Sequence, residues 1–301
     1  MLADLGAQVD KIEDDGAGDY LRWVEPQRGG SSVAFAALNR GKRSAVMNLK
    51  APAGREAFER LVGHYDVLVE QFRPGVLDRL GLGHERLLTR YPRLVICALT
   101  GYGQDGPLRD RAGHDINYLA RGGLLGVQGP GGGAPPQIPG FQLADVSGGM
   151  WVAIAVLGAL RRRDATGEGG VSDIAMADGL VGFASLSLPR GLLGEELPRG
   201  DEVLSGGAAA YNTYLAKDGA PMTLGSLEPK FWTAFATANG IEPDLSALVP
   251  GPHQKALKEK LAAVFASRTR PEWEAFAREH DCCVEPVIPA HELLADEQLR
   301  A

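Results

Sequence analysis

Short apolar runs alternate with helix-like patterns through the first half of the chain. Residues 67–69 and 94–99 are typical of buried strands, and residues 77–91 between them have the spacing of a helix. The pattern also predicts a helix over residues 53–62 and a further strand over residues 171–175. Strands that alternate with helices indicate parallel βαβ units, so we predict an α/β domain with a parallel sheet.

The chain begins with a helix-like segment over residues 1–7, and a strand pattern follows over residues 8–13. A sheet of this kind normally has a strand before its first helix, so we expect that an N-terminal strand is missing. Residues 145–163 are small and apolar, and they predict a helix that is buried on most sides.

The second half has a different organisation. Residues 129–140 and 198–210 are rich in glycine and proline and predict a loop and a linker. Residues 211–224 predict a hairpin with a type I′ turn at an Asp-Gly pair. The helices then expected are residues 228–239, 255–266 and 271–280. We therefore predict a large domain over 1–197, a linker over 198–210 and a smaller α+β domain over 211–301.

Composition is that of a globular protein: 45% of the 301 residues are hydrophobic and 23% are charged. The net charge of −7 argues against non-specific nucleic-acid binding, yet it permits local basic clusters for a phosphorylated ligand. The longest apolar run, residues 150–160, is too short to span a bilayer. The first residues lack the basic start of a signal peptide, and three cysteines cannot form a disulfide framework. We therefore expect a cytoplasmic protein with reduced thiols.

Two segments gather basic residues near predicted strand and helix ends. Arginine suits bidentate phosphate contacts and lysine supplies a point charge, while Met47, Leu49 and Phe72 could hold an adenine ring. The alternative is a solvated basic surface on an otherwise acidic protein. The basic residues are Arg40, Lys42, Arg43, Lys50, Arg73 and Arg79.

Three acidic or imidazole groups are candidates for acid–base chemistry. His114 lies beside Asp115 at a loop-to-helix junction, and a histidine there can act as a general base. Asp145 begins an apolar helix whose N-terminus would stabilise an anion and could receive an enolate. Glu228 precedes a proline that can begin a helix. Helix capping is the alternative role for each. The other histidines are expected at the surface: His64, His84, His253, His280 and His291.

Seven segments in this order resemble class III CoA-transferases and alpha-methylacyl-CoA racemases, the CaiB/BaiF-like family. They are LADLGAQVDKIE, NRGKRSAVMNLK, EQFRPGVLDRLGLG, ALTGYGQDGP, AGHDINYLA, LADVSGGMW and GSLEPKFW. The resemblance implies a Rossmann-like large domain and a smaller α+β domain. It also implies an interlocked homodimer, with the active site between the large domain of one chain and the small domain of the other.

The resemblance also implies roles for the acid–base residues. Asp145 matches the transferase aspartate that forms an aspartyl-CoA thioester, and racemases add a histidine that matches His114, with Asp115 in the same segment. Glu228 matches a racemase glutamate that orients the histidine, within one chain or across the dimer. Residues 205–210 replace the four glycines of formyl-CoA-type transferases. These features favour the racemase branch.

CoA is the only cofactor-like group that the resemblance implies, as part of an acyl-CoA substrate, and no metal is expected. Two departures bear on activity. Asp14 stands where relatives often carry an arginine that contacts CoA phosphate, and both chain ends are shorter than expected, including a C-terminal return to the large domain. The implied CoA contacts are Met47, Leu49, Lys50, Gln71, Phe72 and Arg79, with Arg40 and Arg43 in addition.

Three hypotheses follow from this resemblance. The first is a racemase that exchanges the alpha proton of a 2-methylacyl-CoA between His114 and Asp145, with the enolate received by N–H groups near Asp145. The second is a CoA-transferase that works through an aspartyl-CoA thioester. The third, motivated by Asp14 and the short ends, is a CoA-binding remnant without catalysis.

Overall fold

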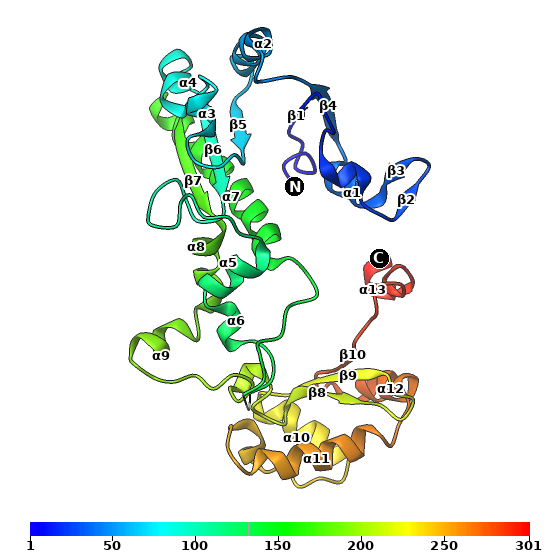
Figure 1. Ribbon diagram of the computed structural model, residues 1–301. Coiled ribbons are helices and arrows are strands. Elements are labelled where there is room, and N and C mark those ends of the chain that lie inside the picture. Colours follow the sequence, from blue (N-terminus) through cyan, green and yellow to red (C-terminus); the bar gives the residue numbers. More distant parts are fainter. Residues whose placement is uncertain (132) are drawn as a thin grey trace. The chain divides into compact units, whose positions relative to one another are not determined.

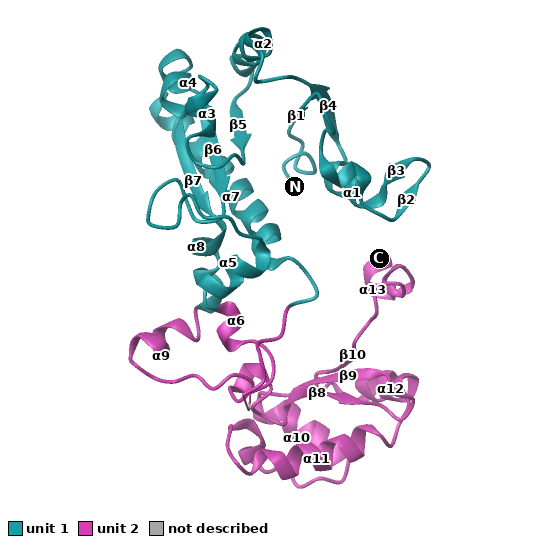
Figure 2. Cartoon of the chain, viewed as in Figure 1, with its two compact units in different colours: residues 1–123, 139–184 teal, residues 124–138, 185–301 magenta. Residues whose placement is uncertain are grey.

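The structure is a computed structural model that describes residues 1–131 and 133–301; Gly132, in the predicted 129–140 loop, lies outside the described residues. The chain divides into two compact units (Figure 2). Unit 1 holds Met1–Gly123 and Pro139–Ala184, and unit 2 holds Leu124–Ile138 and Ser185–Ala301. The units group residues 124–138 and 185–197 with the C-terminal part, whereas the predicted domain limits at 197 and 211 stay a prediction.

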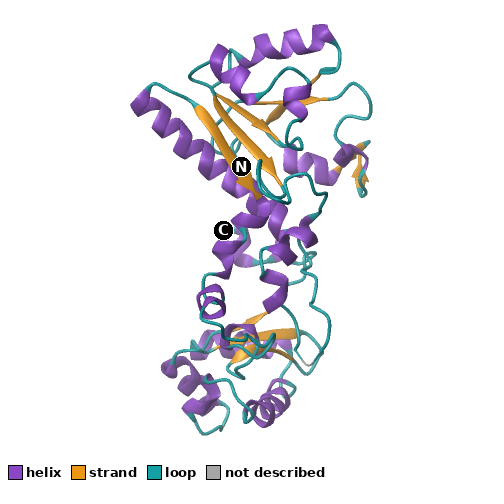
Figure 3. Ribbon diagram, turned by 60° about the vertical axis from the view of Figure 1, so that its left-hand side comes forward, coloured by secondary structure: helices purple, strands orange, loops and turns teal. Residues whose placement is uncertain are grey.

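Unit 1 is built on a parallel sheet of β5 (Val67–Glu70), β6 (Val95–Thr100) and β7 (Gly170–Ala175), in that order (Figures 1 and 3). The central strand β6 is almost wholly buried. That explains its continuous apolar sequence, which is typical of parallel strands covered on both faces. The predicted α/β class with parallel strands is confirmed.

Helices cover the two faces of this sheet. Ile96 on β6 belongs to a core with residues of α2 (Pro52–Val62) and α4 (His84–Arg90). The next residue, Cys97, points to the other face and packs against α7 (Leu143–Thr166). Successive side chains of a strand alternate between faces, so one strand anchors both layers.

The helix predicted over residues 77–91 is wrong as a single element. The structure has a short α3 (Val76–Arg79) and then α4, with a break over residues 80–83. Gly81 has φ of 72°, a left-handed conformation that ends α3 and that glycine adopts at little cost. The glycine therefore overrides the apolar spacing that made the segment look continuous.

Helix α7 confirms the predicted helix at 145–163, but the expectation that it is buried on most sides is wrong. Val146, Met150, Ile154 and Leu157 form an apolar stripe that is exposed in this single chain. Among the described helices, α7 alone is long and apolar enough to cross a membrane, although a core helix of a soluble protein has the same properties.

The start of unit 1 differs from prediction in two ways. Residues 1–7 form turns, because Gly6 has φ of 96° and interrupts a helix. Strand β1 (Val9–Glu13) is confirmed within the predicted 8–13, but its parallel partner β4 (Lys42–Val46) was not predicted. The intervening elements are η1 (Tyr20–Trp23), β2 (Gln27–Arg28), β3 (Ser31–Ser32) and α1 (Val33–Asn39).

Unit 2 contains an antiparallel sheet in the order β10–β9–β8. The hairpin of β8 (Tyr211–Leu215) and β9 (Pro221–Gly225) is confirmed, but its predicted type I′ turn is wrong. That turn needs positive φ at both central residues, and Gly219 has it whereas Asp218 does not. Strand β10 (Val284–Pro286) was not predicted.

Three helices pack against this sheet and confirm the predicted segments: α10 (Pro229–Ala238), α11 (Gln254–Phe265) and α12 (Arg270–His280). Their core is aromatic, and the rings of Phe265 and Trp273 lie 4.5 Å apart. The remaining elements are α5 (Asp115–Arg121), α6 (Leu124–Val127), α8 (Met176–Gly179), η2 (Val181–Ala184), α9 (Leu188–Leu192), η3 (Val203–Ser205), η4 (Leu245–Leu248), η5 (Leu293–Ala295) and α13 (Glu297–Arg300).

Candidate active site

His114 lies at the exposed N-cap position of α5 in unit 1. Its backbone N–H donates to Asn117 Oδ1 at 3.0 Å, and its carbonyl accepts the Asn117 N–H at 2.8 Å. Asn117 therefore holds the backbone at the helix start by reciprocal bonds. The backbone is thus held in place at His114, and the residue is exposed.

Asp115 caps a helix, but not its own. Its Oδ1 accepts the N–H of Ala144 at 2.7 Å and of Asp145 at 3.1 Å, in the first turn of α7. A carboxylate at a helix N-terminus is favoured by the partial positive charge of the unpaired N–H groups. The N-cap residue of α7 is Gln142, whose side chain makes no cap bond, so Asp145 is not the N-cap.

The carboxyl of Asp145 lies within electrostatic reach of both residues of the α5 start. Partial desolvation is the largest cause that raises the pKa of Asp145, and the charge of Asp115 raises it further, whereas His114 lowers it. Tyr118 has its own pKa raised, first by burial and then by Tyr102 and Asp145. His114 and Asp115 therefore both lie near enough to the Asp145 carboxyl in unit 1 to affect its pKa.

The expectation that N–H groups near Asp145 receive an enolate is wrong for this conformation. The first two N–H groups of α7 that follow Leu143 donate to Asp115 Oδ1, as described. The N–H of Leu143 itself donates to Phe141 O at 3.1 Å, and that of Val146 to Gln142 O at 3.0 Å. An enolate oxygen could bind there only by displacing the Asp115 carboxylate.

The first predicted CoA-binding segment follows β4. Met47 and Leu49 are half-buried and pack against the core that covers one face of β6. Lys50, by contrast, is exposed. Asn48 holds the turn, because its Oδ1 accepts the Lys50 N–H at 2.9 Å and its Nδ2 donates to Asp15 at 2.8 Å.

The two additional candidates for CoA contacts, Arg40 and Arg43, already form ion pairs with aspartates of this chain. Arg40 donates to Asp4 at 2.8 Å, and Arg43 makes a bidentate pair with Asp10 at 2.6 and 2.7 Å. Both arginines are exposed, so a phosphate would compete with an acidic neighbour in water. Such exposed pairs contribute little to stability and can be exchanged at small cost.

The second predicted CoA-binding segment follows β5. Gln71, Phe72 and Arg79 are exposed, as a ligand contact requires. Behind them, Glu70 is buried and its carboxylate lies 3.0 Å from His84 Nε2. His84 was expected at the surface, and that expectation is wrong: its side chain is only 22% exposed, because the turn after α3 brings it against the strand end.

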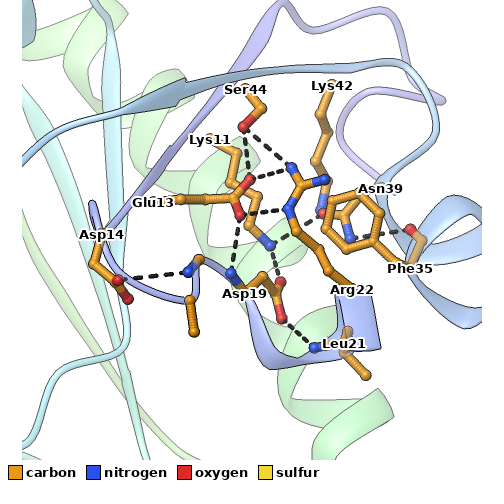
Figure 4. Close-up of polar contacts among 12 residues, drawn as sticks. Lys11, Glu13, Asp14, Asp19, Leu21, Arg22, Phe35, Asn39, Lys42 and Ser44 are labelled. Carbon is orange, nitrogen blue, oxygen red and sulfur yellow. Dashed lines mark hydrogen bonds and ion pairs between the residues drawn. The ribbon is translucent and has the colours of Figure 1, made fainter. Parts of the chain in front are cut away.

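A buried carboxylate network ties the segment after β1 to β4 (Figure 4). Glu13 accepts Arg22 Nε at 2.8 Å, Arg22 Nη2 at 2.7 Å, Ser44 Oγ at 2.6 Å and the Asp19 N–H at 2.9 Å. Arg22 is the largest cause that holds the pKa of Glu13 well below its ordinary value. Asp14, by contrast, accepts the Gly16 N–H at 2.7 Å in a local turn. Sequence reasoning missed this network.

Glu228 lies in unit 2 as the exposed N-cap residue of α10, yet its side chain makes no cap hydrogen bond. Burial is the main cause that raises the pKa of Cys283, and the charge of Glu228 adds to it, so the two lie close together. The Glu228 carboxylate is therefore available for a role other than capping.

All three cysteines are free thiols, as expected.

Known proteins resemble this chain over its whole length. The model of CoA-transferase family III matches residues 1–301. The human alpha-methylacyl-CoA racemase is 38% identical over 98% of this chain and 74% of its own length. The succinyl-CoA–D-citramalate CoA-transferase of Chloroflexus aurantiacus is 32% identical over 98% of this chain and 75% of its own.

Solved structures agree. A CAIB/BAIF family protein from Brucella suis superposes with a TM-score of 0.83 at 30% sequence identity, covering 99% of this chain and 81% of that one. Its agreement extends over both units of the chain, and the family model leaves no part unmatched. The relatives of this chain include racemases and CoA-transferases, which are enzymes. This chain belongs to CoA-transferase family III.

Proposed function

We propose that this protein is an acyl-CoA racemase that exchanges the alpha proton of a 2-methylacyl-CoA thioester. The observation that carries the proposal is the cluster of His114, Asp115 and Asp145, in which partial burial and then the charge of the capping Asp115 raise the pKa of the Asp145 carboxyl. A raised pKa favours the protonated acid that one face of a two-base racemase needs. The identity to a racemase over 98% of the chain also supports it.

The reaction follows from the chemistry of the thioester. Its alpha C–H is acidic because the carbanion delocalises onto the carbonyl oxygen as an enolate. Neutral His114 takes the proton from one face, and protonated Asp145 delivers a proton to the other; for the opposite enantiomer the roles exchange. General acid–base catalysis of this kind contributes about 10²- to 10⁴-fold in rate, or about 3–5 kcal/mol of barrier. The chain needs no cofactor beyond the CoA of its substrate.

The test uses enantiomerically pure 2R- and 2S-methylacyl-CoA in D₂O, followed by mass spectrometry and chiral analysis. The wild-type protein should incorporate alpha deuterium into both and interconvert them. Each single-base variant, His114→Gln or Asp145→Asn, should label only the enantiomer that faces its remaining base, without inversion. The two variants should select opposite enantiomers. Labelling of both enantiomers by either variant would exclude the two-base assignment.

Matched controls come from exposed residues of the same types. His291, with a side chain 82% exposed, and Asp110, with one 81% exposed, should tolerate His291→Gln and Asp110→Asn without loss of exchange. Glu228→Gln tests the orienting glutamate, and it should slow exchange while leaving enantiomer selection unchanged.

A CoA-transferase is the second candidate, favoured by the transferase relative of 32% identity. No hydrogen-bond donor in the described part of the chain occupies the Asp145 carboxylate, so it is also open to attack a thioester carbonyl. Attack would form a mixed anhydride of Asp145 and the acyl group and expel CoA as its thiolate. The thiolate would then attack the Asp145 carbonyl, which forms the aspartyl-CoA thioester and releases the acyl group as a free carboxylate. Hydroxylamine trapping of Asp145, with transfer of CoA to a free acid and no alpha deuterium, would establish this function instead.

We further infer a homodimer. The exposed stripe of α7 supports it, since Val146, Met150, Ile154 and Leu157 form a contiguous apolar face that a partner would cover. Sedimentation equilibrium should give twice the mass of 31.9 kDa, and Ile154→Asp should shift the protein toward the monomer. A cytoplasmic location and a role in lipid metabolism are part of the same proposal.

A further inference from the structure

Glu70 is a buried carboxylate at the C-terminal end of β5, with only 7% of the residue exposed. One oxygen, Oε2, accepts the Phe72 N–H at 2.7 Å, and the other, Oε1, lies 3.0 Å from His84 Nε2. The single carboxylate therefore joins three elements: the strand end, the turn at Gln71 and Phe72, and the first residue of α4.

The surroundings of this pair are acidic. Three groups act on His84 and raise its pKa: first Glu70 through the hydrogen bond, and then Asp78 and Asp173, while burial opposes them. Glu70 also contributes to the raised pKa of Cys97 on the neighbouring strand. His84 is thus the cationic partner of a buried carboxylate, and a buried charge without such a partner is costly.

We propose that Glu70 and His84 are a positioning pair that holds the Gln71–Phe72 turn in the conformation that receives the CoA moiety. The inference rests on the proposed function, in which Gln71 and Phe72 contact CoA. Neither Glu70 nor His84 is assigned a contact with the ligand; both act through the Phe72 backbone. The pair therefore affects binding of CoA and not the proton transfer at His114.

The sign of the pH effect follows from the raised pKa of His84. Its imidazolium compensates Glu70 at low pH, and this support is lost as pH rises through the pKa of the folded protein. Neutral His84 can still donate one hydrogen bond, but it leaves three carboxylates without the cation. Affinity for CoA should therefore weaken as pH rises, with KM changing and kcat largely preserved.

The experiment measures the dissociation constant of CoA by calorimetry on the full-length protein, from one pH unit below to two above the ordinary histidine pKa of about 6.5. His84→Gln keeps a neutral donor and removes the titration. It should weaken binding at the low end by about tenfold, the effect of one charge-assisted bond, and flatten the pH dependence. His84→Lys should restore tight binding and extend it to higher pH. His64→Gln is the control, at an exposed histidine whose pH profile should match the wild type.

The outcomes separate this inference from the proposed function. Wild-type binding that is independent of pH, or His84→Gln binding equal to wild type, would overturn the positioning pair even if deuterium exchange is observed. The predicted pH dependence without any alpha-deuterium exchange would refute the racemase and leave the positioning pair in place. Failure to bind CoA at any pH would refute both. Circular dichroism of each variant shows whether a loss of binding reflects unfolding.

Discussion

Replacement of Arg22 by methionine tests whether the Glu13 network holds β1 and β4 together. The Glu13 side chain is 3% exposed, and Arg22 supplies two of its four hydrogen bonds, at 2.8 and 2.7 Å. Ser44 and the Asp19 N–H supply the other two. Methionine retains an apolar side chain over the Phe35 ring, which lies 4.0 Å from the guanidinium carbon, but removes both charged donors.

The expected loss can be bounded from this geometry. Removing one partner of a fully buried ion pair costs about 3–5 kcal/mol, and a hydrogen bond to a charged group contributes about 1.5–3 kcal/mol. The Arg22 side chain is 37% exposed, so water already screens it and can replace part of its contribution. With two donors left on Glu13, we expect Arg22→Met to lower the free energy of unfolding by about 2–3 kcal/mol.

Urea unfolding followed by tryptophan fluorescence measures this change, since Trp23 adjoins the substituted residue. Arg28→Met, at an exposed residue of β2, is the matched control and should stay within about 0.5 kcal/mol of wild type. Because Arg22 depresses the pKa of Glu13, the carboxylate contributes fully above its unfolded value of 4.5 and loses this contribution as pH falls. Glu13→Gln should therefore lose less stability in acid than wild type. Equal stability of the two arginine variants would refute the reasoning.

Two further predictions concern the site and the sheet. Asp115→Asn keeps an oxygen for the α7 cap but removes the charge that contributes to the raised pKa of Asp145. The acidic limb of the pH profile of deuterium exchange should therefore move to lower pH. An unchanged limb would contradict the effect of Asp115 on the Asp145 pKa. Gly169→Ala places a Cβ 1.9 Å from the Leu94 carbonyl oxygen and should cost several kcal/mol in thermal unfolding, whereas Gly158→Ala within α7 meets no atom within 4 Å and should stabilise by up to about 1 kcal/mol.

The sequence predicted the elements whose apolar residues repeat regularly. Strand β6 is buried on both faces, and β5, β7 and helix α2 contribute apolar residues to the cores on those faces. Strand β4 was missed because all five of its residues are exposed, so pairing with β1 is its only signal. For α7 the error was the reverse. Its apolar residues predicted burial on most sides, but part of them are exposed in the single chain.

The sequence suggested which residues belong to the candidate site, but it did not show which of them contact one another. Spacing along the chain suggested that Asp115 and Asp145 each cap their own helix, because a sequence reports neighbours within one turn. The bond from Asp145 N to Asp115 spans 30 residues, and the Glu70–His84 pair spans 14. Such contacts depend on how the strand ends and helix starts meet, which no local pattern encodes.

The sequence left helix capping and a part in catalysis as alternatives at the His114–Asp115 junction. In the structure, the same Asp115 carboxylate caps α7 and acts on the Asp145 carboxyl. Serine, threonine or asparagine would cap α7 about as well, so helix stability alone does not require a charge there. Asp115 does more than cap: its negative charge adds to the burial that raises the pKa of the neighbouring Asp145 carboxyl, and the helix N-terminus that it caps favours an anion there. The two carboxyl groups, one on α5 and one on α7, thus take different roles: Asp115 caps the helix, and Asp145 is the candidate proton carrier. A racemase needs that asymmetry, because one of its two bases must begin each turnover protonated.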